Sequence, residues 1–432
     1  MGGLSSALAL AKKGFKDIQV YETASNLGFV GAGIQLAPNM ARILDRLGVW
    51  NEIAAEAVIL KNTSIRQGAS DEELGFVDLN YIAETYKYPH CVGHRASLAN
   101  ALYNGCEKEP AITFHFSTSI VDVISWSPTP SFTVQPRNGE AYTVEGDLLL
   151  GADGIKSRVR SGLLKKLNHT AAVVDSGQAA YRIMLTREQM SKSPRAKEML
   201  ELLDSESVRR WIGPRKHIIA YPVSSHQIYN LSTAQPDTNF AVAPSETYTT
   251  KGSKSAMMKI YSDFNPLIKE MLDLVPEGEV CEWKLRVHEP LPTWVQGSVG
   301  LIGDACHPTL PHLAQGAAQA IEDSAVIAEV LAMLPSTSSE MINRALKVYE
   351  EVRKERAEVL VEMAAQSGRT LHLGEGKAKE ERDRLFEELK KARKQGAKVP
   401  DKWADAEVQK MIYGFDAMEV AKEMAGKVFA RE

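Results

Sequence analysis

Apolar residues recur at helical spacing in three segments and predict the main helices of the chain. Residues 2–14 carry leucines and alanines on one helical face, and Gly14 stands where a left-handed helix end is expected. Residues 39–50 repeat the pattern after a proline and stop at Gly48. Residues 316–334 are rich in alanine, which predicts a long helix able to pack closely on a sheet.

Short runs of β-branched and apolar residues predict strands between these helices. Residues 17–22 end in an acid and have the profile of a buried parallel strand. Three further runs, 111–126, 131–136 and 141–154, follow one another as strands. The last of them is continuously apolar before it breaks at the letters GADG, so we expect it to be buried on both faces.

Between about 175 and 290 the pattern changes to strands that alternate with turn signals, with one helix near 264–275. These strands predict an antiparallel sheet inserted in an α/β protein. A buried strand and loop return at 298–308, and the chain from about 340 onward is helical and charged, which is typical of a solvated helix face. We therefore divide the chain into residues 1–170, 171–290, 291–335 and 336–432.

The composition is that of a globular protein with more than one core. The chain has 432 residues, 44% of them apolar and 25% charged, and exceeds the ceiling of about 250 to 300 residues for one core. With a formal net charge of −4 it has no global basic field, so we expect neither a nucleic-acid nor a membrane partner. The four cysteines lack metal-ligand spacing and no apolar run can span a bilayer, so we expect no metal site and a cytoplasmic location.

The first helix opens with two glycines, and an acid ends the next strand. A dinucleotide-binding fold places a strand and GxGxxG before a helix, because bare backbone there cradles pyrophosphate, and an acid about 20 residues later binds a ribose hydroxyl. Gly3 fits the last glycine and Glu22 the acid, whereas the first strand and the earlier glycines do not precede them. A Gly-capped helix followed by a surface glutamate explains this fragment equally well. The GAG at 31–33 is no substitute, because Leu36 takes the place of the third glycine.

Two later acids each follow a predicted buried strand. Asp153 lies in GADGIKSRVR and Asp304 lies in GLIGDACHPTLPHLAQG. An acid at such a strand end accepts hydrogen bonds from polyol hydroxyls, and the amide N–H groups at the start of the helix after Asp304 suit an anionic ring. Taken singly, each segment also fits a structural turn with a helix cap.

In this order along the chain, the segments resemble the FAD-dependent aromatic hydroxylases of the salicylate hydroxylase and para-hydroxybenzoate hydroxylase type, most closely the fungal salicylate-hydroxylase-like monooxygenases. The resemblance includes GAGIQLAPNMARILDRLG, HRASL at 94–98 and YEEVRKERAEV in the tail, and it runs from residue 2 to about 430. It implies a Rossmann-like FAD-binding domain in the first and third parts, a substrate-binding sheet in the second and helices in the fourth. It also implies hydroxylation of a phenolic or aromatic-acid substrate through a flavin C4a-hydroperoxide, with O2 and with NADH or NADPH as a transient co-substrate.

The resemblance implies that eight residues contact FAD. On the nucleotide side these are Gly3 at the pyrophosphate, Glu22 at the adenosine ribose and Arg95 at the pyrophosphate or ribityl chain, where a permanently charged fork suits phosphate oxygens. Asp153 serves both FAD and the nicotinamide cofactor. On the flavin side they are Asp304 at the ribityl chain, Pro311 near the reactive face, and Gly316 and Ala317, whose N–H groups face the pyrimidine edge. Ala314 and Ala318 depart from the glycine and asparagine that the family often has there.

Three residues are candidates for the substrate side. Attack by a phenol is helped by negative charge on its oxygen, so cations and tyrosines are expected in the inserted sheet. Arg182 and Tyr221 fit this role, although a structural ion pair and a core tyrosine explain them about as well. His312 fits an acceptor for the phenolic proton, with an unpartnered loop histidine as the commoner alternative. His217 and Trp211 are weaker candidates for the pocket wall.

Two interpretations compete with a hydroxylase. One is another FAD-dependent oxidoreductase on the same frame, an epoxidase or a dehydrogenase, and the other is a truncated, inactive flavoprotein-like pseudoenzyme. The second rests on the start of the chain, which lacks roughly the first dozen residues of the family pattern, as from a wrong start site or a true truncation. The substrate, the position of hydroxylation, the choice between NADH and NADPH and the oligomeric state stay open.

Overall fold

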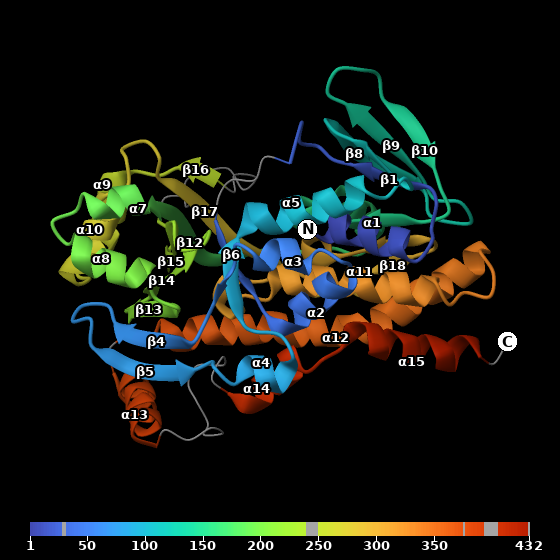
Figure 1. Ribbon diagram of the computed structural model, residues 1–432. Helices are drawn as coiled ribbons and strands as arrows, with labels where there is room; N and C mark the ends of the chain where they lie inside the picture. The colour runs from blue at the N-terminus through green and yellow to red at the C-terminus, as the bar shows by residue number, and fades with distance from the viewer. Residues whose placement is uncertain (28–31, 239–248, 375, 393–404, 431–432) are drawn as a thin grey trace.

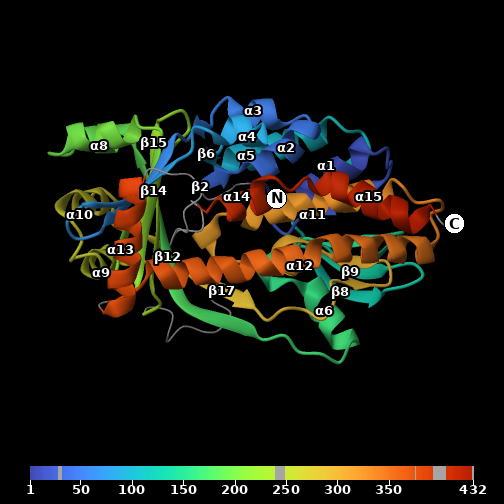
Figure 2. The same cartoon turned by 90° about the horizontal axis from the view of Figure 1, so that it is seen from below.

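The computed structural model describes residues 1–27, 32–238, 249–374, 376–392 and 405–430. In that part of the chain a large sheet with its own helices occupies one end of the molecule, and the N-terminal helices lie toward the other end (Figure 1). The long helix α12 (Ser339–Leu371) runs along both halves (Figure 2). One continuous helix therefore extends along both halves of the described chain.

Helices of the first part end where the sequence predicts. Helix α1 (Gly2–Lys12) is followed by Gly14 at φ +89°, and α2 (Pro38–Arg46) by Gly48 at φ +79°. Glycine adopts this left-handed conformation without strain, so both predicted ends are confirmed. The other helices of this part are α3 (Trp50–Ala54), α4 (Ile82–Tyr86), α5 (Arg95–Glu107) and α6 (Arg158–Lys166), with a 3₁₀ turn η1 (Gly154–Lys156).

Four small sheets accompany these helices. Two contain parallel pairs: β1 (Ile18–Tyr21) with β7 (Ile112–His115), and β11 (Leu149–Gly151) with β19 (Val299–Leu301), which β18 (Val295–Gln296) flanks. Two are antiparallel: β8 (Thr118–Ser125), β9 (Ser131–Pro136) and β10 (Tyr142–Glu145), and β2 (Gly33–Leu36), β6 (Cys91–His94) and β3 (Val58–Ile59).

Burial of the parallel strands differs from the expectation at two places. The buried strand expected near residue 299 is confirmed, because all of β19 is buried. The expectation of a strand buried on both faces is wrong for β11, where Leu149 and Leu150 are half-buried, and β1 is also incompletely buried. In the described part of the chain each of these two strands has one hydrogen-bonded neighbour, so its other edge is open.

The sheet predicted for the middle of the chain is confirmed, and it is larger than expected. Its eight strands lie in the order β16-β17-β12-β15-β14-β13-β4-β5, antiparallel except for β13 and β4. Strands β4 and β5 come from the first part of the chain, and β4 pairs with β13 with Asn62 opposite Ser207. The division at residue 170 stays a prediction. The strands are β4 (Asn62–Gln67), β5 (Glu73–Asp78), β12 (Val173–Thr186), β13 (Ser207–Gly213), β14 (Lys216–Val223), β15 (Ile228–Pro236), β16 (Thr249–Lys251) and β17 (Cys281–His288).

The two faces of this middle sheet differ in character because side chains alternate along each strand. One face packs on α7 (Arg187–Ser191), α8 (Ala196–Leu203), α9 (Lys254–Ile260) and α10 (Pro266–Asp273) around an apolar cluster. Trp211 belongs to that cluster and donates its Nε1–H to Asp71 at 2.6 Å, so it lies on the face opposite to Arg182 and Tyr221, and its place in a pocket wall stays a prediction. The opposite face, here called the polar face, carries Gln178, Arg182, His217, Tyr221, Asn230 and Ser232.

The predicted Ala-rich helix forms as α11 (Gly316–Leu331), but it packs between helices instead of on a sheet. Its main neighbours are α1, α2, α12 and α15 (Ala417–Phe429). Small side chains let α1 and α11 approach closely, and Ser324 hydrogen-bonds to Ser5 at 2.8 Å and Ser6 at 2.9 Å across the contact. Two 3₁₀ turns precede α11, namely η3 (Gly303–Ala305) and η4 (Pro311–Leu313).

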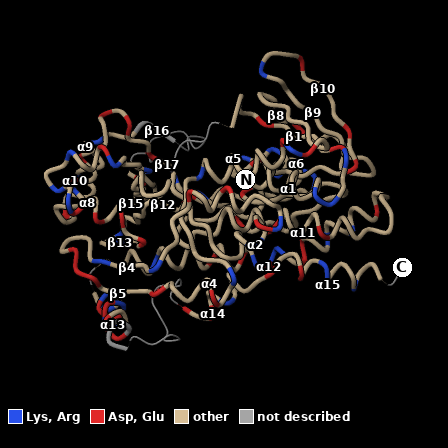
Figure 3. The backbone as a smooth tube through the Cα atoms, in the orientation of Figure 1, with Lys and Arg blue, Asp and Glu red and all other residues tan. Residues whose placement is uncertain are grey.

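Charged residues of both signs are interspersed over the chain (Figure 3). The charged segment near residue 380 forms α13 (Lys377–Ala392), which places Phe386 against β5, and residues 393–398 of that segment lie outside the described residues. Helix α14 (Ala406–Tyr413) follows. None of the described helices combines the length and the apolar character that crossing a membrane requires.

Candidate active site

The two loops that carry Asp153 and Asp304 leave the same sheet edge. They follow β11 and β19, which are parallel neighbours, so their carboxyl ends coincide. Arg160 joins the loops, because its guanidinium donates to the carbonyl of Ala305 at 3.1 Å and to that of Ile155 at 2.6 Å. Arg160 is 6% exposed, and the sequence analysis assigned it no role.

The carboxylate of Asp153 is committed to its own helix. Its oxygens accept hydrogen bonds from the Ser157 hydroxyl at 2.5 Å and from the backbone N–H groups of Arg158 at 2.6 Å and Val159 at 3.2 Å. Asp153 thus holds the start of α6 while remaining exposed. Its contact with FAD and the nicotinamide cofactor stays a prediction.

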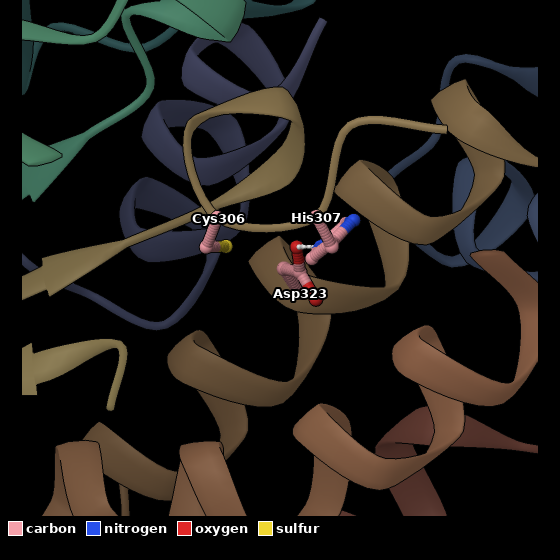
Figure 4. Close-up of side chains that lie close together, drawn as sticks. All are labelled: Cys306, His307 and Asp323. Carbon is pink, nitrogen blue, oxygen red and sulfur yellow. Dashed lines mark hydrogen bonds and ion pairs between the residues drawn. The ribbon is translucent and has the colours of Figure 1, made fainter. Parts of the chain in front are cut away.

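Asp304 is exposed on a turn whose other residues are buried. The turn is fixed from behind by Asp323 of α11, which accepts hydrogen bonds from the Gly303 N–H at 2.9 Å and from His307 Nε2 at 2.6 Å (Figure 4). Gly303 adopts φ +59°, and a Cβ there would lie 3.0 Å from the Cβ of Ala320. The backbone therefore presents the Asp304 carboxylate outward, with no hydrogen bond or ion pair to it from the described residues.

Cys306, His307 and Asp323 place their donor atoms within 4.8 Å of one another, as in a metal site. The Asp323 oxygens are already used, since Oδ1 accepts from Arg353 Nε at 2.9 Å and Oδ2 accepts the two bonds described above. Burial raises the pKa of Asp323, but His307 and Arg353 outweigh it and hold that pKa below its usual value. An arginine at hydrogen-bond distance opposes a cation, so this group is a hydrogen-bonded brace.

Three predicted cofactor-binding residues gather at the start of α1. Burial lowers the pKa of the Met1 amino group, Arg95 lowers it further, and Asp304 and Glu22 raise it, so these three side chains lie within electrostatic reach of one point. Arg95 is half-buried, and its guanidinium has no acidic partner in the described part of the chain. Gly3 lies one residue into α1, which has no side-chain cap, so its amide groups are free for a ligand.

The start of α11 presents a second uncapped helix end beside η4. Gly316 and Ala317 are half-buried at its first turn, and the N-cap side chain makes no hydrogen bond to that turn. Pro311 is exposed on η4. Ala314, where the family often has glycine, adopts φ +53° and ψ 33°, the left-handed conformation that favours glycine.

The predicted substrate-side residues Arg182 and Tyr221 lie together on the polar face. The Arg182 guanidinium stacks on the ring of Trp283 at 4.5 Å. Burial lowers the pKa of Arg182 and the charge of Arg95 lowers it further, whereas Tyr221 and Cys281 oppose this. No carboxylate pairs with Arg182 among the residues that the structure describes. The charge of Arg95, at the start of α5, therefore acts on Arg182, which shares the polar face with Tyr221.

His312 points away from the exposed Pro311 beside it. Its ring is 3% exposed, and its Nε2 lies 3.0 Å from Gln178 Oε1. The rings of His217 and His372 lie 5.4 and 5.5 Å from it, centroid to centroid. Burial, with smaller contributions from His372 and Arg210, lowers the pKa of His312 to about 3, so the ring is uncharged at neutral pH. His312 thus lies in a histidine cluster, and its role as a base stays a prediction.

Comparison with known proteins gives a consistent result. A family profile described as FAD binding domain matches residues 1–364. The FAD-dependent monooxygenase ntnJ of a Nectria species is 32% identical over 385 residues, which cover 89% of this chain and 86% of ntnJ. The 3-hydroxybenzoate 6-hydroxylase of Klebsiella oxytoca is 29% identical over 86% of this chain and 87% of that enzyme. A structure of salicylate hydroxylase with its substrate has a TM-score of 0.76 at 22% identity and covers 98% of this chain and 95% of that chain, which shows the same fold.

The residues present fit FAD. Two uncapped helix ends suit its pyrophosphate and its anionic ring edge, the unpaired guanidinium of Arg95 suits phosphate oxygens, and the carboxylates of Glu22 and Asp304 suit ribose and ribityl hydroxyls. The resemblance and the fold class inferred from the motifs are thereby confirmed. The chain belongs to the FAD-dependent monooxygenases that include the aromatic hydroxylases, and FAD is its cofactor.

Proposed function

We propose that the protein hydroxylates a phenolic or aromatic-acid substrate bound between the polar face and the loops that hold FAD, with NADH or NADPH as electron donor. FAD supplies the electron transfer and the activation of O2. The protein binds the ring, orients it and keeps water away. Relatives named as 3-hydroxybenzoate 6-hydroxylase and 6-hydroxynicotinate 3-monooxygenase support a small aromatic acid as the substrate class.

One observation carries the substrate class. Arg182 is half-buried and lies in the field of Arg95, and neither has an acidic partner among the described residues. Like charges at such a site repel, and a buried cation without a counter-ion is costly. An aromatic carboxylate or phenolate lowers the cost at Arg182 by pairing with its guanidinium, while the FAD phosphates are the partner proposed for Arg95. The Trp283 ring under Arg182 holds the guanidinium and gives an apolar wall for a planar ring.

Tyr221 supplies a neutral hydrogen-bonding group beside this anion site. Burial raises its pKa, and Arg182 opposes this only in part, so its phenol stays protonated at neutral pH. The hydroxyl makes no hydrogen bond within the described part of the chain, so it is available to the substrate oxygen. We therefore assign Arg182 the binding of the anionic group and Tyr221 the orientation of the ring.

His312 stays the proposed acceptor of the phenolic proton, although its lowered pKa of about 3 makes it the weakest of the three substrate-side assignments. Its Nδ1 is buried and has no hydrogen-bond partner within the described residues, while Nε2 is held by Gln178. With Nε2–H donating to Gln178 Oε1, Nδ1 carries the free lone pair. His312→Gln is expected to lower kcat below the pH at which the phenol ionises, and to matter less above it.

The test is a screen of phenols and aromatic acids with the holoenzyme, measuring substrate-stimulated oxidation of NADH and NADPH and the mass of the product under isotope-labelled O2. The proposal expects a product that gains one labelled oxygen on the ring. Stimulated oxidation with an oxygen added across a double bond indicates an epoxidase, and a product without added oxygen indicates a dehydrogenase; either result overturns the proposal.

The role of Arg182 is tested with Arg182→Lys, which keeps the charge and loses the planar fork. We expect KM for an aromatic acid to rise about tenfold or more while FAD occupancy is unchanged, since a bidentate contact is lost. Arg187→Lys is the matched control, because Arg187 is the first residue of α7, directly after the same strand, and pairs with Asp204. An unchanged KM in Arg182→Lys removes Arg182 from the site.

A further inference from the structure

Gly33, the last residue of the GAG at 31–33, has a structural role although this GAG is not the GxGxxG of a dinucleotide-binding loop. Gly33 opens β2, and its N–H donates to Oδ1 of Asn230 in β15 at 2.7 Å. A Cβ at position 33 would lie 2.6 Å from Cγ of Asn230 and 2.6 Å from the ring of Tyr221. The backbone of β2 is therefore seated directly on the polar face. Gly31 lies outside the described residues.

This contact is one step from Arg95. The carbonyl of Ala32 accepts a hydrogen bond from the N–H of Arg95 at 2.9 Å, and Gly33 pairs with His94 in the β2–β6 ladder. The backbone on both sides of Gly33 therefore holds the first turn of α5, where Arg95 lies. The Asn230–Gly33 contact thus joins the sheet that carries Arg182 to the strand pair that leads into α5, where Arg95 lies.

Packing of β15 does not require an amide at this position. Asn230 is 1% exposed, and its Nδ2 makes no hydrogen bond within the described part of the chain. A buried polar atom without a partner costs free energy that an apolar side chain of similar size avoids. Among the residues that the structure describes, the hydrogen bond to the Gly33 N–H is the one contact for which the amide is needed.

We propose that Asn230 is a positioning residue that sets Arg95 in its place between FAD and the substrate anion site. It acts through Gly33 and the Ala32–Arg95 backbone hydrogen bond. Loss of the Oδ1 acceptor leaves the Gly33 N–H unpaired, so β2 moves off the polar face and Arg95 moves with it. The inference rests on the role of Arg95 in the proposed function.

The test compares the FAD dissociation constant of the holoenzyme and its variants, measured from flavin fluorescence on dilution. Asn230→Leu removes the acceptor and keeps the branched shape of the side chain, and Gly33→Ala separates the same contact from the other side. Each is expected to weaken FAD binding about tenfold, the equivalent of one lost hydrogen bond in a buried site. Asn265→Leu is the matched control. Asn265 is also a buried asparagine, but it caps α10 on the opposite side of the sheet, so FAD binding by this variant is expected to be unchanged.

A double-mutant cycle separates positioning from general loss of stability. If Asn230 acts through Arg95, Asn230→Leu has no further effect on FAD binding when Arg95→Gln is present. Three outcomes each overturn the inference. The fold-changes in the FAD dissociation constant multiply in the double variant, or both Asn230→Leu and Gly33→Ala bind FAD as the wild type does, or Arg95→Gln alone has no effect. If Asn230→Leu does not fold, the cycle is run with Gly33→Ala. Failure of the proposed function is seen separately, as no substrate-stimulated NAD(P)H oxidation by the wild type.

Discussion

Arg353 is the residue whose removal is expected to cost most stability, because it neutralises two buried acids at once. It is fully buried and donates to Glu322 Oε2 at 2.5 Å, to Asp323 Oδ1 at 2.9 Å and to Gln319 Oε1 at 2.6 Å. Arg353→Met keeps an unbranched, apolar stem and removes the charge. Glu322 retains Arg356 at 2.9 Å, but Asp323 retains only His307 and the Gly303 N–H among its described partners.

Breaking one partner of a buried ion pair costs about 3–5 kcal/mol, a large share of the about 5–15 kcal/mol by which a native domain is stable. Urea unfolding of the holoenzyme, followed by circular dichroism and by flavin release, measures this loss. The control is Arg369→Met, since the Arg369–Glu362 pair has side chains 66% and 60% exposed and an exposed pair contributes about 0–1 kcal/mol. Equal losses in the two variants would refute the argument that burial decides the energy. Flavin release is expected at lower urea in Arg353→Met, because Asp323 holds the turn of Asp304.

Three other outcomes are expected. Burial lowers the pKa of His90 from 6.5 to about 4, so between these pH values the unfolded chain binds more protons than the folded chain. The contribution of His90 to the free energy of unfolding is therefore complete above pH 6.5 and decreases as the pH falls toward 4. At pH 5 the free energy of unfolding of the wild type is lower by about 2 kcal/mol for this reason. We expect His90→Gln to abolish this loss in pH-dependent unfolding, and His169→Gln, at an exposed position, to leave it unchanged. The same acid sensitivity in all three proteins would contradict this. Ala314→Gly is expected to raise stability by about 1 kcal/mol in calorimetry, because the left-handed backbone at Ala314 strains a Cβ, and a lower melting temperature would be the wrong sign. Asp304→Ala is expected to weaken FAD retention, measured by ultrafiltration, with an unchanged circular dichroism spectrum; full flavin occupancy would remove Asp304 from the cofactor site.

Local signals in the sequence predicted helix ends and strand positions well. Gly14 and Gly48 end their helices in the left-handed conformation, which is a property of the residue itself. The strand run at 131–136 forms β9 with the same limits. Burial was less predictable, because β11 is as apolar as a central strand and yet has one neighbour. A strand's composition does not state what lies beside it.

Residues that hold the loops of the site in place were harder to find in the sequence than residues proposed to contact the cofactor. Asp304 stands out in the sequence because an acid follows an apolar strand. Arg160 and Arg353 carry no such mark, since each lies in a charged segment typical of a solvated helix. A signal was present in Glu322 and Asp323, two adjacent acids in an Ala-rich apolar helix, which require buried cationic partners.

The sequence by itself determined the cofactor class and the order of the parts, because glycines, strand-end acids and helix starts act through their own backbone and appear in a specific order along the chain. Only the tertiary structure decided that β4 joins β13, that the charge of Arg95 acts on Arg182 where no described carboxylate pairs with either, and that the Asn230 side chain bonds to the backbone of β2 at Gly33. These contacts join segments far apart in the chain, and their energy depends on distance and burial. Neither quantity is encoded by the spacing of residues along the chain.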